Sequence, residues 1–238
     1  MCVASVAWDA HPRWLLVAVG NRDEFHARPT APLASWEDLP GVIAGRDLQG
    51  GGTWLGVSEA GRFALVTNYR HPEGPHPGRP TRGKLVTDLL QGREPEGAAA
   101  MNAFNLVHAA PAAAGFLTNW PQEVAAPLPP GIHGLSNGGF EAPWPKTHAL
   151  NDALARWLER GSDDAAPLFA AMADATLLGG DGPSPAHSGV FIRDAIYGTR
   201  CSTFVAIERD GAGRIVERRF DAEGHVTGET VIAFRWPT

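Results

Sequence analysis

The first 24 residues, Met1–Glu24, read MCVASVAWDAHPRWLLVAVGNRDE and give the strongest indication of the fold. Two apolar runs, residues 3–8 and 14–20, flank a turn-like segment that contains a proline, so the stretch predicts a β-hairpin. A hairpin brings the residue before its first strand close to the residues that follow its second strand. We therefore expect Cys2 to lie beside the tetrad Asn21-Arg22-Asp23-Glu24.

Cys2 is the most informative single residue, because removal of Met1 leaves a thiol and a free α-amine on it. Methionine is normally removed when the second residue is small, and we expect its removal here. An α-amine has a pKa near 7.7–8.0, so it can act as general base for its own thiol, as in N-terminal-nucleophile enzymes. Position alone also fits a small hydrophobe at the start of a strand.

The tetrad has a plain and a catalytic interpretation. Four polar residues after an apolar strand are usually a solvated turn. Beside Cys2, however, Arg22 would lower the pKa of the thiol, and Asp23 would hold or orient the α-amine.

The rest of the chain predicts strands, then helices, then strands again. This order differs from the alternation of a parallel βαβ sheet and favours antiparallel sheets with helices on their outer faces. No repeat or linker divides the sequence, so we expect one domain over residues 1–238, with a loop over the proline-rich segment 71–80. The predicted strands cover residues 41–46, 53–58, 62–68, 115–118, 189–193, 196–208, 214–220 and 226–235, and the predicted helices cover 83–91, 96–104, 146–160 and 166–178.

Composition excludes several classes of function. The chain has 238 residues and a net charge of −6, which disfavours non-specific nucleic-acid binding, and no apolar run is long enough to span a bilayer. Its two cysteines, Cys2 and Cys201, are too few for a disulfide framework, and the N-terminus lacks the features of a signal peptide. We expect a reducing, cytoplasmic location. The histidine spacing predicts no metal site, and we expect no cofactor.

Two glycine-containing motifs need separate interpretations. Gly50-Gly51-Gly52-Thr53-Trp54 lacks the lysine of a phosphate-binding loop, so close backbone packing is the better reading. Gly134-Leu135-Ser136-Asn137-Gly138 matches the nucleophile elbow of serine hydrolases. A weaker alternative is therefore a serine esterase that uses Ser136 as nucleophile and His187 or His225 as base. An elbow needs a helix directly after the serine, whereas glycines and prolines follow here.

Taken together, several segments resemble one family, the NRDE or Transport and Golgi Organisation family. They occur in the family's order, and the match runs from residue 2 to at least residue 203. These segments are Met1-Cys2, Asn21-Arg22-Asp23-Glu24, Gly51-Gly52-Thr53-Trp54-Leu55-Gly56, Thr67-Asn68-Tyr69-Arg70, His133-Gly134-Leu135-Ser136-Asn137, Pro143-Trp144-Pro145-Lys146 and Tyr197-Gly198-Thr199-Arg200.

That family is similar to N-terminal-nucleophile amidohydrolases of the choloylglycine hydrolase and penicillin V acylase kind. The resemblance implies a four-layer αββα sandwich with Cys2 as nucleophile and Arg22 and Asp23 as the charged pair beside it. It further implies oxyanion-side roles for Asn68 and Asn137 and a distal arginine, Arg200, that supports the nucleophile, while Asn21 and Glu24 support the motif.

The leading hypothesis is therefore a hydrolase that cleaves a non-peptide C–N amide bond in a small acylated substrate, with no metal or organic cofactor. The alternative is a non-catalytic carrier or chaperone for an acyl lipid or haem on the same fold. The sequence contains neither a Cys-Pro dipeptide nor paired histidines, which are the features that would indicate a haem ligand.

Cys201 follows Arg200 in a predicted strand, where successive side chains point to opposite faces. If Arg200 faces the site between the sheets, Cys201 is expected to face the outer helical layer as a packed, inert thiol. The sequence thus predicts no disulfide between Cys2 and Cys201.

Overall fold

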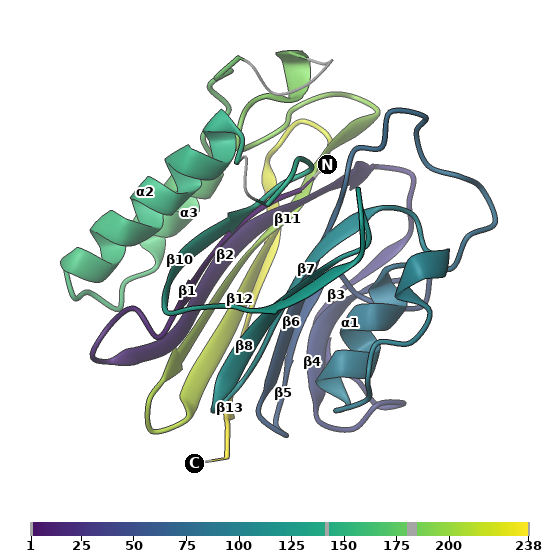
Figure 1. The fold of residues 1–238 in the computed structure, drawn as a ribbon. Coiled ribbons are helices and arrows are strands. Elements are labelled where there is room, and N and C mark those ends of the chain that lie inside the picture. The colour runs from purple at the N-terminus through teal and green to yellow at the C-terminus, as the bar shows by residue number, and fades with distance from the viewer. Residues whose placement is uncertain (1, 141–142, 180–184, 238) are drawn as a thin grey trace.

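The computed structural model describes residues 2–140, 143–179 and 185–237, and its strands form two stacked antiparallel sheets (Figure 1). One sheet has six strands in the order β10-β1-β2-β11-β12-β13. These strands are β10 (Gly131–Leu135), β1 (Val3–Trp8), β2 (Trp14–Phe25), β11 (Tyr197–Glu208), β12 (Ala212–Phe220) and β13 (Val226–Arg235).

The other sheet has seven strands in sequence order, so each strand pairs with its neighbour in the chain. These strands are β3 (Thr30–Ser35), β4 (Val42–Asp47), β5 (Leu55–Ser58), β6 (Arg62–Asn68), β7 (Phe104–Ala110), β8 (Ala113–Thr118) and β9 (Val124–Pro127).

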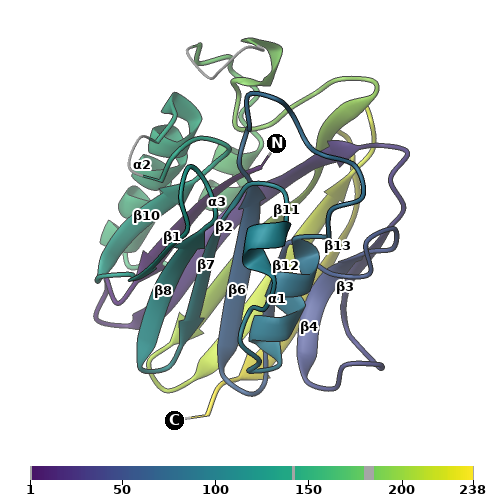
Figure 2. The same ribbon diagram turned by 45° about the vertical axis from the view of Figure 1, so that its right-hand side comes forward.

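Helices cover the outer face of each sheet. The helices α2 (Pro145–Glu159) and α3 (Ala166–Met172) pack on the six-stranded sheet, and α1 (Gly83–Leu90) packs on the seven-stranded sheet (Figure 2). Three apolar layers result, one between the sheets and one beneath each set of helices. The predicted αββα sandwich is confirmed.

Side-chain alternation along β2 decides what each face of this strand contacts. Leu16 and Ala18 belong to the core between the sheets, whereas Val17 and Val19 pack against α2 and α3. Because alternate residues share a face, Arg22 points between the sheets and Asn21 points toward the helices. The tetrad is therefore part of a central strand and not a solvated turn, because β11 pairs with β2 as far as Phe25.

Several predicted elements differ from the structure. Residues 96–104 form no α-helix but contain a short 3-10 turn, Ala98–Ala100, before β7 begins. The alanines there favour a helix, but Gly97 has a positive φ of 74° directly before them and the chain enters β7 at Phe104, so only the short 3-10 turn forms. Residues 189–193 form no strand, and four observed strands were not predicted, namely β3, β7, β9 and β10.

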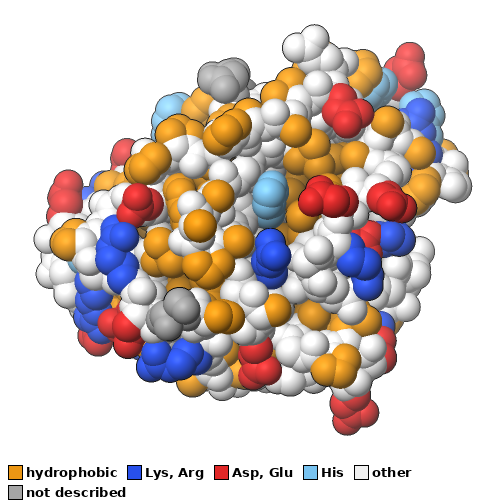
Figure 3. Space-filling model, turned by 60° about the horizontal axis from the view of Figure 1, so that its bottom comes forward, with side chains coloured by type: hydrophobic (Ala, Val, Ile, Leu, Met, Phe, Trp, Pro, Cys, Tyr) orange, Lys and Arg blue, Asp and Glu red, His pale blue; other side chains and the backbone are white. Residues whose placement is uncertain are grey.

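The surface carries mixed charge on the face drawn in Figure 3, where basic, acidic and apolar side chains are interspersed. This distribution agrees with the modest negative net charge of the chain. None of the helices in the described residues combines the length and the hydrophobicity that a membrane-spanning helix requires.

Candidate active site

The β1–β2 pairing positions Cys2. Val3 pairs with Asn21 and Ala4 with Gly20, so continuing the register places Cys2 opposite Arg22. Gly20 allows this close approach, because a Cβ there would lie 2.9 Å from the Val3 carbonyl oxygen. The hairpin therefore brings the thiol beside the tetrad, as the sequence predicts.

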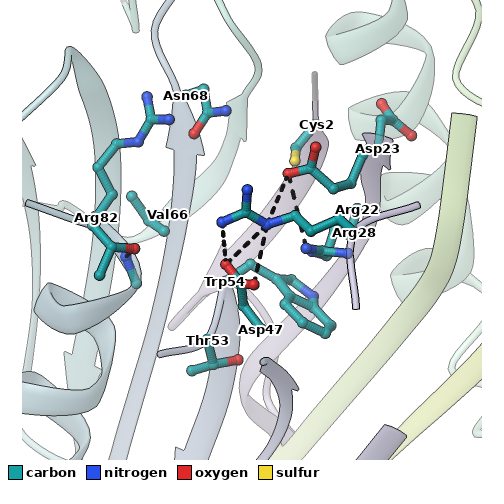
Figure 4. A pocket seen from close by; sticks show the side chains of 13 residues that line it. Cys2, Arg22, Asp23, Arg28, Asp47, Thr53, Trp54, Val66, Asn68 and Arg82 are labelled. Atoms are coloured by element: carbon teal, nitrogen blue, oxygen red, sulfur yellow. Dashed lines mark hydrogen bonds and ion pairs between the residues drawn. The ribbon is translucent and has the colours of Figure 1, made fainter. Parts of the chain in front are cut away.

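Cys2 opens into a polar cavity of about 120 Å³ between the ends of the two sheets, which we call the nucleophile cavity (Figure 4). Strands β2, β4 and β6, the turn before β5 and the start of α1 all contribute to it. Its lining consists of Cys2, Arg22, Asp23, Glu24, Arg28, Asp47, Thr53, Trp54, Val66, Asn68, Thr81, Arg82 and Gly83.

Arg22 is held firmly against the cavity wall. Only 5% of it is exposed, and its guanidinium lies 4.5 Å from the centre of the Trp54 ring, a cation–π contact. Its Nη1 donates to Thr30 Oγ1 at 3.2 Å, and its Nη2 lies 3.9 Å from the Glu24 carboxylate. These contacts keep a positive charge in the wall of the cavity that Cys2 enters.

Arg28 and Asp47 form a fork-shaped ion pair across the cavity (Figure 4). Arg28 Nη2 donates to Asp47 Oδ2 at 2.7 Å and Nε donates to both carboxylate oxygens at 3.1 Å, while Glu24 lies 3.7 Å from Nε. The charge of Arg28 is thus matched within the protein.

Asp23 is 3% exposed and sits where β2 meets β11. Thr199 Oγ1 donates to its Oδ1 at 2.7 Å, and the Tyr197 hydroxyl donates to its backbone carbonyl at 2.8 Å. Burial raises the pKa of Asp23 to about 6, against the opposing effect of nearby positive charges that include Lys146 and Arg22. Lys146, from the Pro143-Trp144-Pro145-Lys146 segment, is itself completely buried.

Burial also raises the pKa of the Cys2 thiol above its usual value, and the negative charge of Asp23 adds to the effect. The Asp23 backbone amide and the charge of Arg22 lower the pKa of the thiol, and the effect of Arg22 is the one that the sequence predicts. The net result is still a raised pKa. A thiol in this state is protonated at neutral pH, so its use as a nucleophile requires a base.

The raised pKa of Asp23 predicts a specific pH dependence of stability. Between about pH 4 and pH 6 only the unfolded chain releases the Asp23 proton, so the wild type loses stability as pH rises through this window. Relative to wild type, Asp23→Asn should gain about 2–3 kcal/mol of unfolding free energy between pH 4 and pH 7. Urea unfolding of both proteins at several pH values measures the difference; a difference that stays constant with pH contradicts the assignment.

Asn21 ties the strand to the helical layer instead of lining the cavity. Its Nδ2 donates to the carbonyls of Met172 at 2.8 Å and Val190 at 2.9 Å, and its Oδ1 accepts from Ser202 Oγ at 2.6 Å. This network fixes β2 against β11 and α3, and it leaves Arg22, Asp23 and Glu24 as the tetrad residues that line the cavity.

Asn68 and Asn137 occupy different places. Asn68 ends β6 and lines the nucleophile cavity, whereas Asn137 is buried next to it and donates from Nδ2 to the Asn68 carbonyl at 2.5 Å. Among the residues that the structure describes, Asn137 Oδ1 has no hydrogen-bond partner. Asn137 therefore supports the end of β6 from behind the cavity lining.

The geometry at Ser136 does not fit a serine nucleophile elbow. The Ser136 hydroxyl donates to the Cys2 carbonyl at 3.1 Å, and the next helix begins only at Pro145. An elbow needs its helix directly after the serine, so the serine esterase alternative is wrong. Ser136 instead anchors the backbone of the candidate nucleophile.

Arg200 lies outside the nucleophile cavity. Its Nη1 donates to the carbonyls of Phe25, His26 and Arg28 at 3.0–3.2 Å, so it braces the connection from β2 to β3. It lines a neighbouring cavity of about 130 Å³ on the far side of Trp54. The structure thus brings Arg200 near the site, but its contacts are with the backbone that carries Arg28.

The expected orientation of Cys201 is wrong. Thr199 pairs with Asp23 but Cys201 pairs with Arg22, so Arg200 is the extra residue of a β-bulge and the alternation shifts by one position. Cys201 consequently faces the space between the sheets, beside Glu217 in the cavity that Arg200 lines. Both cysteines are free, and burial raises the pKa of the Cys201 thiol well above its usual value.

Four further residues line the cavity although no role was predicted for them: Arg28, Asp47, Trp54 and Arg82. Trp54 belongs to one of the motifs that carry the family resemblance, so a role for it could have been predicted from the sequence. The other three carry no local pattern, because they come from separate loops and strands that only the folded chain brings together.

Some histidines lie close to acidic side chains. The ligand atoms of His71, Glu73 and His76 lie within 4.8 Å of one another, as do those of Asp221, Glu223 and His225. Neither group lines the nucleophile cavity. A backbone amide already donates to His71 Nδ1.

Comparison with known proteins places these features in context. The profile of the family described as "Transport and Golgi organisation 2" matches residues 1–222. Two proteins named "Transport and Golgi organization protein 2 homolog", from Bos taurus and Homo sapiens, are each 30% identical, and each alignment covers 92% of both chains. A penicillin V acylase structure from Agrobacterium tumefaciens has a similar fold, with a TM-score of 0.50 and 12% identity over 92% of this chain and 83% of that chain.

Proposed function

The chain belongs to the Transport and Golgi organisation 2 family, and from its similarity in fold to a penicillin V acylase and the geometry around Cys2 we propose an amidohydrolase with an N-terminal cysteine nucleophile. Its reaction is the cleavage of a non-peptide C–N amide bond in a small acylated substrate. The observation that carries the proposal is the position of Cys2, which opens into a polar cavity directly opposite Arg22 and beside Asp23.

The proposed mechanism begins with the removal of Met1, which frees the α-amine of Cys2. The raised pKa of the thiol supports a base of this kind, because the resting thiol has to lose its proton before it attacks. The neutral α-amine takes that proton as the sulfur attacks the amide carbon. Asp23, close to the thiol, orients the resulting ammonium group.

Attack produces a tetrahedral oxyanion, and Asn68 is our candidate for its stabilisation, since its side chain lines the same cavity as Cys2. Asn137 acts through its hydrogen bond to the Asn68 carbonyl. Collapse of the intermediate breaks the C–N bond, and the leaving amine takes the proton from the α-ammonium. Water, activated by the same amine, then hydrolyses the thioester to release the carboxylic acid and regenerate the thiol.

Arg22, Glu24 and Arg200 have supporting roles in this proposal. Arg22 provides positive charge near the sulfur, Glu24 stands between Arg22 and Arg28, and Arg200 braces the backbone of Arg28. We propose the cytoplasm as the location, because a reducing compartment keeps both cysteines as free thiols.

Release of amine from a panel of N-acyl amides tests the proposal. We expect multiple turnovers per molecule of enzyme, with no added metal or cofactor. Copurification of an acyl lipid or haem, together with no turnover and an unreactive Cys2, would favour the carrier alternative.

A further inference from the structure

Arg82 is a cavity-lining cation without a carboxylate partner in the described part of the chain. It precedes α1, is partly buried, and donates from Nη1 to the Ala103 carbonyl at 3.0 Å. The other two arginines of the nucleophile cavity both lie within 4.0 Å of a carboxylate oxygen. The Nε and Nη2 edge of Arg82 has no acceptor among the described residues.

An arginine stays protonated even when burial lowers its pKa, as burial does for Arg82. A partly buried charge without a counter-ion is costly, so such a site gains stability when it receives an anion. The free Nε and Nη2 edge has the planar fork that binds a carboxylate through two parallel hydrogen bonds. The backbone contact to Ala103 uses a different nitrogen and leaves that edge available.

Arg82 also occupies a junction. It lines the nucleophile cavity (Figure 4) and also a second cavity of about 610 Å³ beneath the proline-rich loop, which we call the loop cavity. Asn68 likewise lines both cavities. Pockets that bind small ligands generally measure about 300–1,000 Å³, so the nucleophile cavity alone holds little more than the scissile group. The body of a substrate therefore extends past Arg82 into the loop cavity.

The position of Arg82 is fixed by packing as well as by its hydrogen bond. Gly83 follows it and lies against the backbone of Gly52, so close that a Cβ on Gly52 would overlap the Gly83 carbonyl group. This contact, the close backbone packing expected for the glycine run, holds the start of α1 at the cavity wall. Arg82 is thus held in place before any ligand binds.

Resting on the proposed function, we infer that Arg82 selects substrates that carry a carboxylate close to the scissile amide, that is, N-acyl amino acids. The carboxylate of the amine portion pairs with the free edge of Arg82. The acyl chain extends into the loop cavity, where Tyr69, Pro72 and Pro75 contribute apolar surface.

Paired substrates test this inference. Hexanoylglycine and hexanoylethanolamine share the acyl chain and the scissile amide, but only the first carries a carboxylate. We expect wild type to prefer hexanoylglycine in kcat/KM by roughly 10- to 100-fold, the usual size of a charge-assisted contact. Arg82→Gln should reduce that preference to within about 3-fold, and Arg82→Lys, which keeps the charge but not the fork, should fall between.

Lys84→Gln is the matched control. It removes a positive charge two residues further along, on an exposed side chain paired with Asp88 and outside both cavities. It should keep the wild-type preference. If Arg82→Gln slows both substrates equally and leaves their ratio unchanged, Arg82 acts on the thiol and the inference is overturned. Equal rates for the two substrates with wild type also overturn it, while the hydrolase proposal stands.

If wild type cleaves neither substrate, the proposed function has failed, and binding still tests Arg82. Isothermal titration of hexanoylglycine into Cys2→Ala and into the Cys2→Ala/Arg82→Gln double variant makes the comparison. Loss of roughly 10-fold or more in affinity in the double variant supports a carboxylate site. Equal affinity overturns it.

Discussion

Replacing Cys2 by alanine is expected to lower the hydrolysis of hexanoyl-4-nitroanilide by at least about 10³-fold, since the variant lacks the atom that forms the covalent intermediate. The side chain is small and only partly buried, so the fold should survive the change. Release of 4-nitroaniline measures the rate, and circular dichroism checks that the variant is folded.

Cys201→Ser is the matched control for this experiment. Cys201 is buried on the far side of Trp54, next to Glu217, and its thiol pKa is strongly raised, so it has no access to substrate in the nucleophile cavity. The Cys201 thiol hydrogen-bonds to the Glu217 side chain, and a serine hydroxyl can replace it in that contact. We expect Cys201→Ser to retain activity within about 3-fold, and equal losses in both variants would contradict the assignment of Cys2 as the nucleophile.

The second large effect is expected from blocking the α-amine. Inserting a lysine between Met1 and Cys2 prevents removal of the methionine, so the thiol remains but its neighbouring base becomes a peptide nitrogen. The protonated resting thiol then lacks its proton acceptor, and activity should fall by about 10²- to 10⁴-fold, the usual contribution of general base catalysis.

A removable leader separates this effect from misfolding. A protease that cleaves directly before Cys2 regenerates the free α-amine in the same sample, and activity should return on cleavage. Full activity before cleavage would show that the α-amine is not the base, and the mechanism would then need another proton acceptor.

The hairpin at the start of the chain was predictable because its pattern is local. Two apolar runs and a short turn give β1 and β2, and their pairing places Cys2 opposite Arg22. The extent of β2 was not predictable in this way. Asn21, Arg22 and Asp23 look solvent-exposed by residue type, but β11 pairs with them and the helical layer covers Asn21.

Other differences also come from long-range contacts. The alanine-rich region before β7 favours a helix by its own propensity, yet the chain has to reach the pairing of β7 with β6 and β8 by Phe104, and only a 3-10 turn forms before it. The bulge at Arg200 shifts which residues face the site, and a strict alternation rule applied to Cys201 fails for that reason. Bulges leave no clear signature in a single sequence.

The candidate site also combines residues that local sequence motifs indicate with residues that only long-range contacts bring together. The residues that the resemblance singled out are those in continuous motifs, and the structure brings Cys2, Arg22, Asp23 and Asn68 into one cavity. Arg82 belongs to no such motif, and its meaning depends on what is near it in space. An arginine becomes informative only when the fold shows that it is partly buried and lacks a carboxylate partner.

Intact-mass spectrometry after brief incubation with hexanoyl-4-nitroanilide shows whether Cys2 becomes acylated. We expect a protein that lacks Met1 and gains the mass of one hexanoyl group, with peptide mapping placing the group on Cys2 and Cys2→Ala remaining unmodified. An unmodified wild type under conditions where 4-nitroaniline is released, or an adduct that persists in Cys2→Ala, would contradict the assignment of Cys2 as the nucleophile.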